Sequence, residues 1–379
     1  MKNKFISIIS PQYGTAGTDL NYYKIAHNLS SKGHKIKLLI IGDEWNDRHT
    51  SDDLDKVYLI NRNLFSILKN RFFHWKITMI LAIIFSTIPF LIYLFKNKSS
   101  SYLLGLFPIF PLIIFFLVRF KNTIVFSIQG LPRSNLFTMN LFFSKLIKNV
   151  KCVIPNESMK NYLDKKYKIS KNIHYNVISN AVLDQSIITQ SNEEIIDEWY
   201  ADKKLKKIIA VGRLTYQKNF DNLIKSFQNV IEIDSSARLI IIGDGEDFYL
   251  LNNLKKELEL DDSVKFLGYK RNPYKYIKNS DLFVMNSRWE GPGHVLIEAM
   301  GVGCPVITTD CDSGPADTIQ NGEYGLLVKP DDCNQLSQSM IYALKNKQEM
   351  ILKLKKSKLF LNRFYTPEVA DRYLHLFNT

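Results

Sequence analysis

The chain has 379 residues, of which 46% are hydrophobic and 17 are glycine, so it is too long for one ordinary core and fits two globular α/β domains. Fifty lysines and arginines against 37 acidic residues give a formal net charge of +13, and low-complexity segments and repeats are absent from the sequence. The four cysteines have neither Cys-x-x-Cys nor histidine spacing, which argues against a disulfide framework or a zinc site and favours a reducing cytoplasm.

In the first half of the chain, apolar segments of strand length alternate with helical segments, which predicts a parallel sheet. The first apolar run is short and leads into the glycine loop Gly14 to Gly17, so it predicts a strand rather than a signal peptide. A helix is expected from about Asp19 to Lys32. The expected strands are residues 5–10, 36–41, 102–107, 123–128, 151–154 and 174–178.

A long stretch of this half, from Lys56 to Asn156, contains no acidic residue but thirteen lysines and arginines among aliphatic and aromatic runs. Ile77 to Phe95 carries no charge and would pass as a minimal membrane span, and Leu103 to Val118 is a shorter candidate. A single span would place strands of one parallel sheet on opposite sides of a membrane. A two-span hairpin would consume the strand expected at 102–107.

Residues 64–97 are therefore predicted to form one or two apolar helices that lie against an anionic bilayer, although a buried core helix remains an alternative. The headgroup contacts are assigned to Arg71, Lys76, Lys96 and Lys98. Nucleic acid is not expected as a partner, because the basic residues alternate with apolar blocks rather than with stacking motifs. A lysine cluster supports the membrane prediction: Lys145, Lys148, Lys151, Lys160, Lys165, Lys166, Lys168 and Lys171.

The positive charge belongs to the N-terminal part of the chain. Residues 1–182 hold 25 lysines and arginines against 9 acidic residues, a net of +16, and the remaining residues have a net of −3. The predicted organisation is an N-terminal domain over 1–182, a linker over 183–206, a C-terminal domain over 207–362 and a last helix over 363–379. The second strand series is 207–210, 238–242, 264–267, 281–285, 305–308 and 326–328.

The last helix has its own signals. Thr366 is a suitable N-terminal cap and Pro367 suits the first helical turn. Val369, Tyr373 and Leu376 give the helix one apolar face.

The most informative motif is the pair Glu290 and Glu298 around a strand-to-helix turn. The residues Gly291-Pro292-Gly293 allow a close backbone approach, and the N–H groups of the following helical turn suit a diphosphate. Ionised carboxylates only accept hydrogen bonds, so the two glutamates suit the hydroxyl groups of a sugar and a ribose. Two solvent-facing glutamates near a helix start are the alternative for a bare pair.

The wider stretch from Ser287 to Val328, together with Val211-Gly212-Arg213-Leu214 and Gln217-Lys218-Asn219, closely resembles the signature of retaining glycosyltransferases of family 4. That resemblance implies the GT-B fold, with two Rossmann-like domains that face a central cleft and a C-terminal helix that crosses back to the first domain. It also implies a nucleoside-diphosphate sugar donor, most simply a UDP-sugar.

The resemblance assigns roles to individual residues. The implied catalytic residues are Arg213 and Lys218 on the donor phosphates and Glu290 on the sugar. The implied donor-binding residues are Gly17, Gly293, His294, Val295 and Glu298, the last of these on the ribose. No metal or cofactor is implied, since fixed cations can stabilise the leaving diphosphate and no Asp-x-Asp motif is present.

One position departs from the family pattern. Many relatives place a histidine after the strand at 124–128, whereas this chain has Gln129, which can orient a sugar but cannot titrate near neutrality.

The predicted function is transfer of a hexose or N-acetylhexosamine, with retention, to a lipid-linked glycan at the cytoplasmic face of the membrane. The alternatives are a transferase of the same fold with a soluble acceptor, and a catalytically silent scaffold of a polysaccharide assembly complex.

Overall fold

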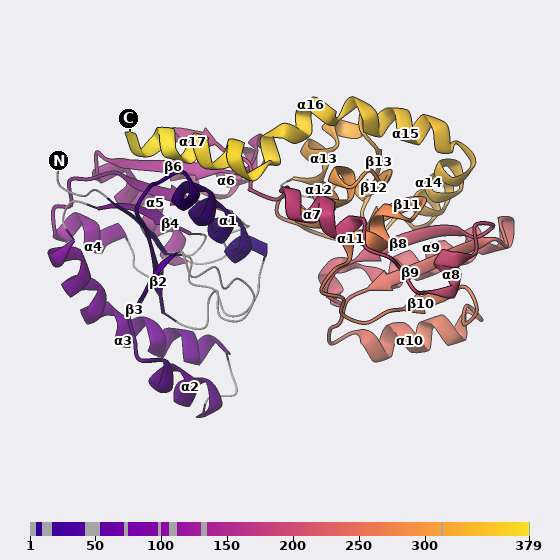
Figure 1. The fold of residues 1–379 in the computed structure, drawn as a ribbon, viewed down its shortest axis with the longest axis horizontal. Coiled ribbons are helices and arrows are strands. Elements are labelled where there is room, and N and C mark those ends of the chain that lie inside the picture. The colour runs from indigo at the N-terminus through magenta and orange to yellow at the C-terminus, as the bar shows by residue number, and fades with distance from the viewer. Residues whose placement is uncertain are drawn as a thin grey trace. The chain divides into compact units, whose positions relative to one another are not determined.

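The computed structural model describes residues 5–9, 17–41, 54–71, 75–97, 100–105, 112–129, 135–311 and 314–378. Several predicted positions lie outside these ranges, including Gly14 to Ala16, Lys98 and residues 106–107. The chain divides into two compact units, the first formed by residues 1–181 and 366–379 and the second by residues 182–365 (Figure 1).

The first unit is built on a seven-stranded parallel sheet with the order β3-β2-β1-β4-β5-β6-β7. Its first six strands repeat the order of a dinucleotide-binding Rossmann sheet. Runs such as Ile124 to Ser127 are buried on both faces, as expected for strands covered by helices on both sides. The strands are β1 (Ile6–Ile9), β2 (Ile36–Ile40), β3 (Asp55–Tyr58), β4 (Ser101–Leu104), β5 (Ile124–Ser127), β6 (Val150–Ile154) and β7 (Tyr175–Val177).

Helices cover both faces of this sheet. Successive residues of a strand point to opposite faces, so they pack against different helices. Leu103 and Val125 pack with α1 and α17, which lie side by side, whereas Leu104 and Phe126 pack with the helices of the other face (Figure 1). The helices of this unit are α1 (Gly17–Ser31), α2 (Arg62–Arg71), α3 (Trp75–Lys96), α4 (Leu112–Leu117), α5 (Asn135–Leu146), α6 (Glu157–Lys166), the 3₁₀ helix η1 (Lys168–Asn172) and α17 (Thr366–Asn378).

The apolar region predicted at 64–97 forms two helices, α2 and α3. One side of α3 packs into the core through residues that include Ala82, Phe90 and Leu94. The other side is exposed although it is apolar, and its members are Ile77, Ile84, Phe85, Ile88, Ile92 and Phe95. In the shorter candidate, residues 103–118, the described residues belong to the end of β4 and to α4, and residues 106–111 lie outside the described ranges. Within the described residues, no helix combines the length and the apolarity needed to cross a membrane.

The second unit contains a six-stranded parallel sheet with the order β10-β9-β8-β11-β12-β13, again the Rossmann arrangement. The strands are β8 (Lys206–Val211), β9 (Ala237–Ile242), β10 (Val264–Phe266), β11 (Leu282–Met285), β12 (Val306–Thr309) and β13 (Leu326–Val328). Helices α9 and α14 belong to the core on one face, and α11 and α12 to the core on the other. Each face therefore has its own buried layer.

The helices of this unit are α7 (Gln185–Ser191), α8 (Glu198–Ala201), α9 (Phe220–Ile233), α10 (Phe248–Glu257), α11 (Tyr274–Lys278), α12 (His294–Gly301), α13 (Pro315–Thr318), α14 (Cys333–Lys345), α15 (Lys347–Lys356) and α16 (Lys358–Leu361), with the 3₁₀ helices η2 (Tyr216–Lys218), η3 (Gln320–Gly322) and η4 (Asn362–Phe364). The buried residues of α9 recur every three or four positions, as in Leu223, Phe227 and Val230.

The segment expected to be a linker, residues 183–206, differs from that expectation because it contains α7 and α8 and lies within the second unit. Asp184 caps α7 by accepting a hydrogen bond from the backbone N–H of Ile187, at 3.2 Å. Asp197 caps α8 in the same way through Trp199, at 2.9 Å. The last helix, α17, starts at Thr366 and packs in the first unit through the predicted apolar face, Val369, Tyr373 and Leu376.

Candidate functional site

The predicted diphosphate and sugar residues of the second unit meet directly. The ammonium of Lys218 forms an ion pair with Oε1 of Glu290, and the hydroxyl of Ser287 donates to the same oxygen at 2.7 Å. The side chain of Glu290 is 9% exposed and that of Lys218 is 20% exposed. η2 follows β8, and the Glu290 loop follows β11, the neighbouring strand in the sheet. Two residues that are 72 positions apart in the sequence are therefore in contact.

Arg213 is the third predicted catalytic residue, and it lies in the loop between β8 and η2. Its side chain is exposed, and it makes no hydrogen bond or ion pair with any residue that the structure describes. The stem of Lys218 passes over Gly212, since a Cβ atom built there would lie 3.4 Å from its Cδ and Cε atoms. Arg213 is thus exposed to solvent, whereas Lys218 is paired with Glu290.

The loop that carries Arg213 is held by the loop after β9. The N–H of Gly212 donates to the oxygen of Ile242 at 3.0 Å, and the N–H of Leu214 donates to the oxygen of Asp244 at 2.9 Å. Gly243 has a φ of +146°, and a Cβ atom there would lie 1.9 Å from the oxygen of Gly212. Only glycine fits this approach.

We expect Gly243→Ala to cost about 3 kcal/mol or more of unfolding free energy, because the added methyl group meets backbone rather than a movable side chain. Gly268→Ala is the matched control. Gly268 also has a positive φ, +66°, but nothing lies within 4 Å of its Cβ position, so about 1 kcal/mol is expected. Urea denaturation measures both, and equal losses would contradict the assigned contact.

The predicted phosphate seat is the start of α12. Gly293 adopts a φ of +68° and is the N-cap residue, and His294 and Val295 are the first two helical residues. A Cβ atom built on Gly293 would lie 3.0 Å from the terminal methyl carbon of Met285, so a larger residue would crowd this helix start. The first backbone N–H groups of a helix point away from it and are the donors that suit an anion. The three predicted residues therefore supply backbone donors at one helix terminus.

Glu298 lies in the same helix, one turn further along. The hydroxyl of Tyr274, from α11, donates to Oε1 of Glu298 at 3.4 Å. Burial, followed by the neighbouring carboxylate of Glu298, raises the pKa of Tyr274 above its ordinary value, so its hydroxyl stays protonated as a donor. Tyr274 thus holds one carboxylate oxygen.

In the first unit, the predicted residues are Gly17 and Gln129. Gly17 begins α1. The amide nitrogen of Gln129 donates to the hydroxyls of Ser127 at 2.8 Å and Tyr373 at 3.3 Å, and those two hydroxyls are 2.8 Å apart. The amide oxygen of Gln129 is buried without a hydrogen-bond partner among the described residues.

Sequence reasoning missed the residues that hold the predicted ones: Ser287, Tyr274, Tyr373, Gly243 and Arg288. Ser287 lies within the motif, three residues before Glu290, and this spacing was the signal that could have identified it. In the described residues, no cluster of histidine, cysteine, aspartate or glutamate has metal-binding geometry, and none of the four cysteines forms a disulfide.

The two Rossmann-like parallel sheets have the architecture of the GT-B fold, which solved glycosyltransferase structures share. Residues 191–358 match the family model described as "Glycosyl transferases group 1". The glycosyltransferase of Rickettsia africae has a TM-score of 0.75 with 17% identity, and the match covers 100% of this chain and 98% of that one. The Anabaena protein HepE in complex with UDP has a TM-score of 0.76 with 15% identity, covering 99% of each chain.

Among proteins of known name, the chain is 37% identical over 137 residues to a transferase of Campylobacter jejuni, which is 36% of this chain and 37% of that protein. That relative is named N-acetylgalactosamine-N,N'-diacetylbacillosaminyl-diphospho-undecaprenol 4-alpha-N-acetylgalactosaminyltransferase. The matched stretch spans about half the length or less of such curated relatives.

Proposed function

We propose that this protein is a retaining glycosyltransferase that moves a hexose or N-acetylhexosamine from a nucleoside diphosphate, most simply UDP, to a lipid-linked glycan. The observation that carries the proposal is the site of the second unit, where Lys218 and Glu290 are paired in the loop that leads into α12. The group 1 match, the UDP in the Anabaena protein and the diphospho-undecaprenol in the Campylobacter name support it.

In this proposal the diphosphate occupies the N-terminus of α12, with Arg213 and Lys218 as its cations. The bond between the anomeric carbon and the diphosphate oxygen breaks, and a bond from that carbon to an acceptor hydroxyl oxygen forms on the same face. The acceptor proton passes to the leaving phosphate oxygen. Fixed cations stabilise the leaving diphosphate more in the transition state than in the ground state, because its charge grows as the bond breaks.

Glu290 and Glu298 hold hydroxyl groups in this scheme rather than act as acid and base. Glu290 accepts from Ser287 and Lys218 through Oε1, which fixes the carboxylate as an acceptor group for a sugar hydroxyl. Glu298 accepts hydrogen bonds from the ribose hydroxyl groups. In the first unit, the proposed roles are orientation of a sugar by Gln129 and close backbone approach of a ligand at Gly17.

The experiment is a transfer and hydrolysis assay with a panel of UDP- and GDP-sugars and polyprenyl-diphosphate-linked saccharides. The proposal expects turnover of at least one donor, with retained configuration at the anomeric carbon. Binding of nucleoside diphosphates without turnover of any donor, with or without lipid-linked acceptors, would favour the scaffold alternative.

We further propose that the first unit attaches peripherally to the anionic cytoplasmic face of a membrane. Support comes from the exposed apolar stripe of α3, whose six members recur at helical spacing on one side. Phe116, Leu117, Phe142 and Leu146 of α4 and α5 are also exposed. Exposed cations flank these helices: Lys96, Arg119, Lys121, Lys145 and Lys148.

One member of the predicted lysine cluster does not belong to that surface. The ammonium of Lys151 donates to the backbone oxygen of Leu376 at 2.8 Å and thereby caps the end of α17. Burial lowers its pKa. The side chains of Arg71 and Lys76 fall outside what the structure describes.

We expect the double substitution Ile88→Glu and Ile92→Glu to weaken sedimentation with phosphatidylglycerol vesicles at least about tenfold, since each isoleucine forfeits burial of about 1.5–3 kcal/mol. Their side chains are 68% and 50% exposed. The control changes Leu352 and Leu359 of the second unit, which are 59% and 83% exposed, to glutamate. Equal sedimentation of wild type and the α3 variant, or no sedimentation of wild type, contradicts attachment through α3.

A further inference from the structure

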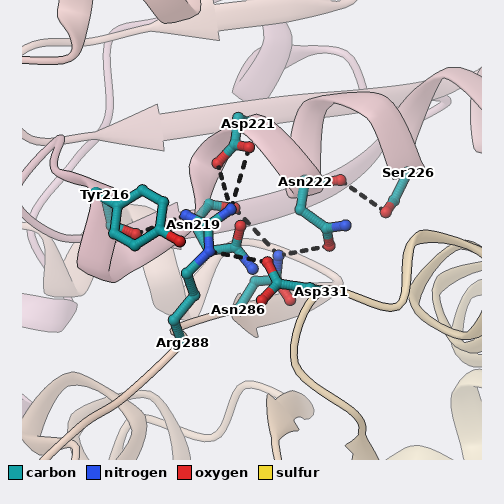
Figure 2. A network of polar contacts seen from close by, with 8 residues as sticks. All are labelled: Tyr216, Asn219, Asp221, Asn222, Ser226, Asn286, Arg288 and Asp331. Carbon is teal, nitrogen blue, oxygen red and sulfur yellow. Dashed lines mark hydrogen bonds and ion pairs between the residues drawn. The ribbon is translucent and has the colours of Figure 1, made fainter.

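Arg288 lies two residues before Glu290, and no role was assigned to it by the sequence. Figure 2 shows it at the centre of a polar network that joins four segments of the second unit. Its side chain is only 13% exposed, so the guanidinium is largely withdrawn from water. A cation held this way needs compensating partners.

All three guanidinium nitrogens are engaged, each with a different segment. Nε donates to Oδ1 of Asp331 at 2.8 Å, and Nη1 donates to the backbone oxygen of Tyr216 at 2.7 Å. Nη2 reaches both oxygens of Asp221, at 3.3 and 3.2 Å, in the first turn of α9. The guanidinium also lies 4.0 Å from the ring centroid of Tyr216. Only the planar guanidinium group of arginine has N–H donors that point to all of these acceptors at once, and the single ammonium of lysine cannot replace it.

The backbone beside Arg288 makes parallel connections to the same turn. The N–H of Arg288 donates to the oxygen of Gln217 at 2.9 Å, and the amide of Gln217 donates to the oxygen of Trp289 at 2.8 Å. The amide of Asn286 donates to the oxygen of Asn219 at 3.1 Å. Residues 286–290 and 216–219 are therefore joined at successive positions, which we call the Arg288 network.

These two segments carry the paired side chains of the proposed site. Lys218 ends η2, a single 3₁₀ turn without a side-chain cap, and it is followed by Asn219 in the left-handed conformation. So short a turn has little stability of its own, and its position depends on contacts with its surroundings. A shift of about 1 Å in a phosphate-binding cation is enough to cost about 100-fold in rate.

Charge gives Arg288 a second effect. Asp221 and Asp331 lie close to the turn that carries Lys218, and Arg288 neutralises part of their charge. Without Arg288, the negative charges of these two carboxylates would repel a diphosphate bound at Arg213 and Lys218.

We propose that Arg288 is a positioning residue, which joins the Lys218 turn to the Glu290 loop and shields the anionic ligand from Asp221 and Asp331. The inference rests on the proposed function, because the ligand is a nucleoside diphosphate. It goes beyond that function by assigning donor affinity to a residue that need not touch the donor.

The test compares Arg288→Gln and Arg288→Lys with a matched control, Arg238→Gln. Arg238 also donates to two backbone oxygens, of Ser235 and Ala237, and lies over an aromatic ring, Trp199, but it is at the amino end of β9. Two quantities are measured: the Kd of UDP by calorimetry, and amide hydrogen exchange of peptides 212–219 and 286–293.

Arg288→Gln is expected to raise the Kd of UDP at least tenfold and to speed exchange in both peptides. Arg288→Lys keeps the positive charge but lacks the guanidinium group. Its Kd should therefore lie between those of wild type and Arg288→Gln, while exchange in both peptides remains fast. Asp331→Asn, a milder change, should speed exchange in the same peptides, and it should add nothing in the Arg288→Gln background. Arg238→Gln should leave both quantities within twofold of wild type.

A purely structural role predicts a different result: Arg288→Gln lowers the melting temperature, while the Kd and the exchange of both peptides stay within twofold of wild type. That result overturns the inference and leaves the proposed function standing. If the wild-type protein binds neither UDP nor GDP, the proposed function itself is contradicted. The role of Arg288 in donor affinity is then contradicted with it.

Discussion

Lys218→Ala is expected to lower the kcat for sugar transfer by about 100-fold to 1,000-fold, the usual effect of removing one group that stabilises developing charge. Lys218 is one of two predicted cations on the diphosphate, and it is the one held in place, through Glu290. Loss of its ammonium leaves the growing charge of the leaving group to Arg213 alone. Because the interaction strengthens in the transition state, kcat should fall more than the donor KM rises.

The substitution also removes the ion-pair partner of Glu290, whose side chain is 9% exposed. Some loss of stability is therefore expected as well, so the melting temperature is measured beside the kinetics. Lys225→Ala on the exposed side of α9 is the matched control. A kcat for Lys218→Ala within threefold of that control would remove Lys218 from the catalytic assignment.

Glu298→Ala is expected to raise the donor KM by about 10-fold to 150-fold, the range for losing a hydrogen bond to a charged group. The ribose lies away from the bond that breaks, so binding is lost equally in the ground and transition states and kcat should change little. The hydroxyl of Tyr274 also loses its acceptor. Steady-state kinetics with the donor varied at saturating acceptor separate the two constants.

Two companion variants sharpen this test. Glu298→Gln keeps an acceptor oxygen without the charge, so its KM should lie between those of wild type and Glu298→Ala. Glu232→Ala, an exposed glutamate near the end of α9, controls for loss of a carboxylate. A large fall in kcat for Glu298→Ala with an unchanged KM would contradict the ribose assignment and point to a role at the reacting carbon.

Local sequence signals placed most of the regular structure. The buried strands are continuous apolar runs, such as Leu282 to Met285, and parallel sheets covered on both faces require such runs. The edge strand β3 (Asp55–Tyr58) was missed because its residues are partly exposed and half of them are charged. Helices α7 and α8 were also missed, although Asp184 and Asp197 precede them as N-terminal caps and could have been recognised.

The buried cluster around Gln129 shows a different limit. Its position after a strand could be predicted, but its hydroxyl partner Tyr373 is 244 residues away in α17. Nothing in the sequence near either residue indicates that contact. It arises because α17 packs on the first sheet beside α1.

The sequence by itself determined which chemistry is available: carboxylates around a glycine turn, two cations after a strand, and an apolar basic region in the first half of the chain. Tertiary structure alone decided which of these groups are paired and which are exposed. Lys218 meets Glu290 and Arg288 meets Asp221 and Asp331 because β8 and β11 are neighbours in the sheet, and β13 ends at the same edge. Parallel strands bring their carboxyl-terminal loops to one edge whatever their distance in sequence, so these contacts depend on strand order rather than on any local pattern.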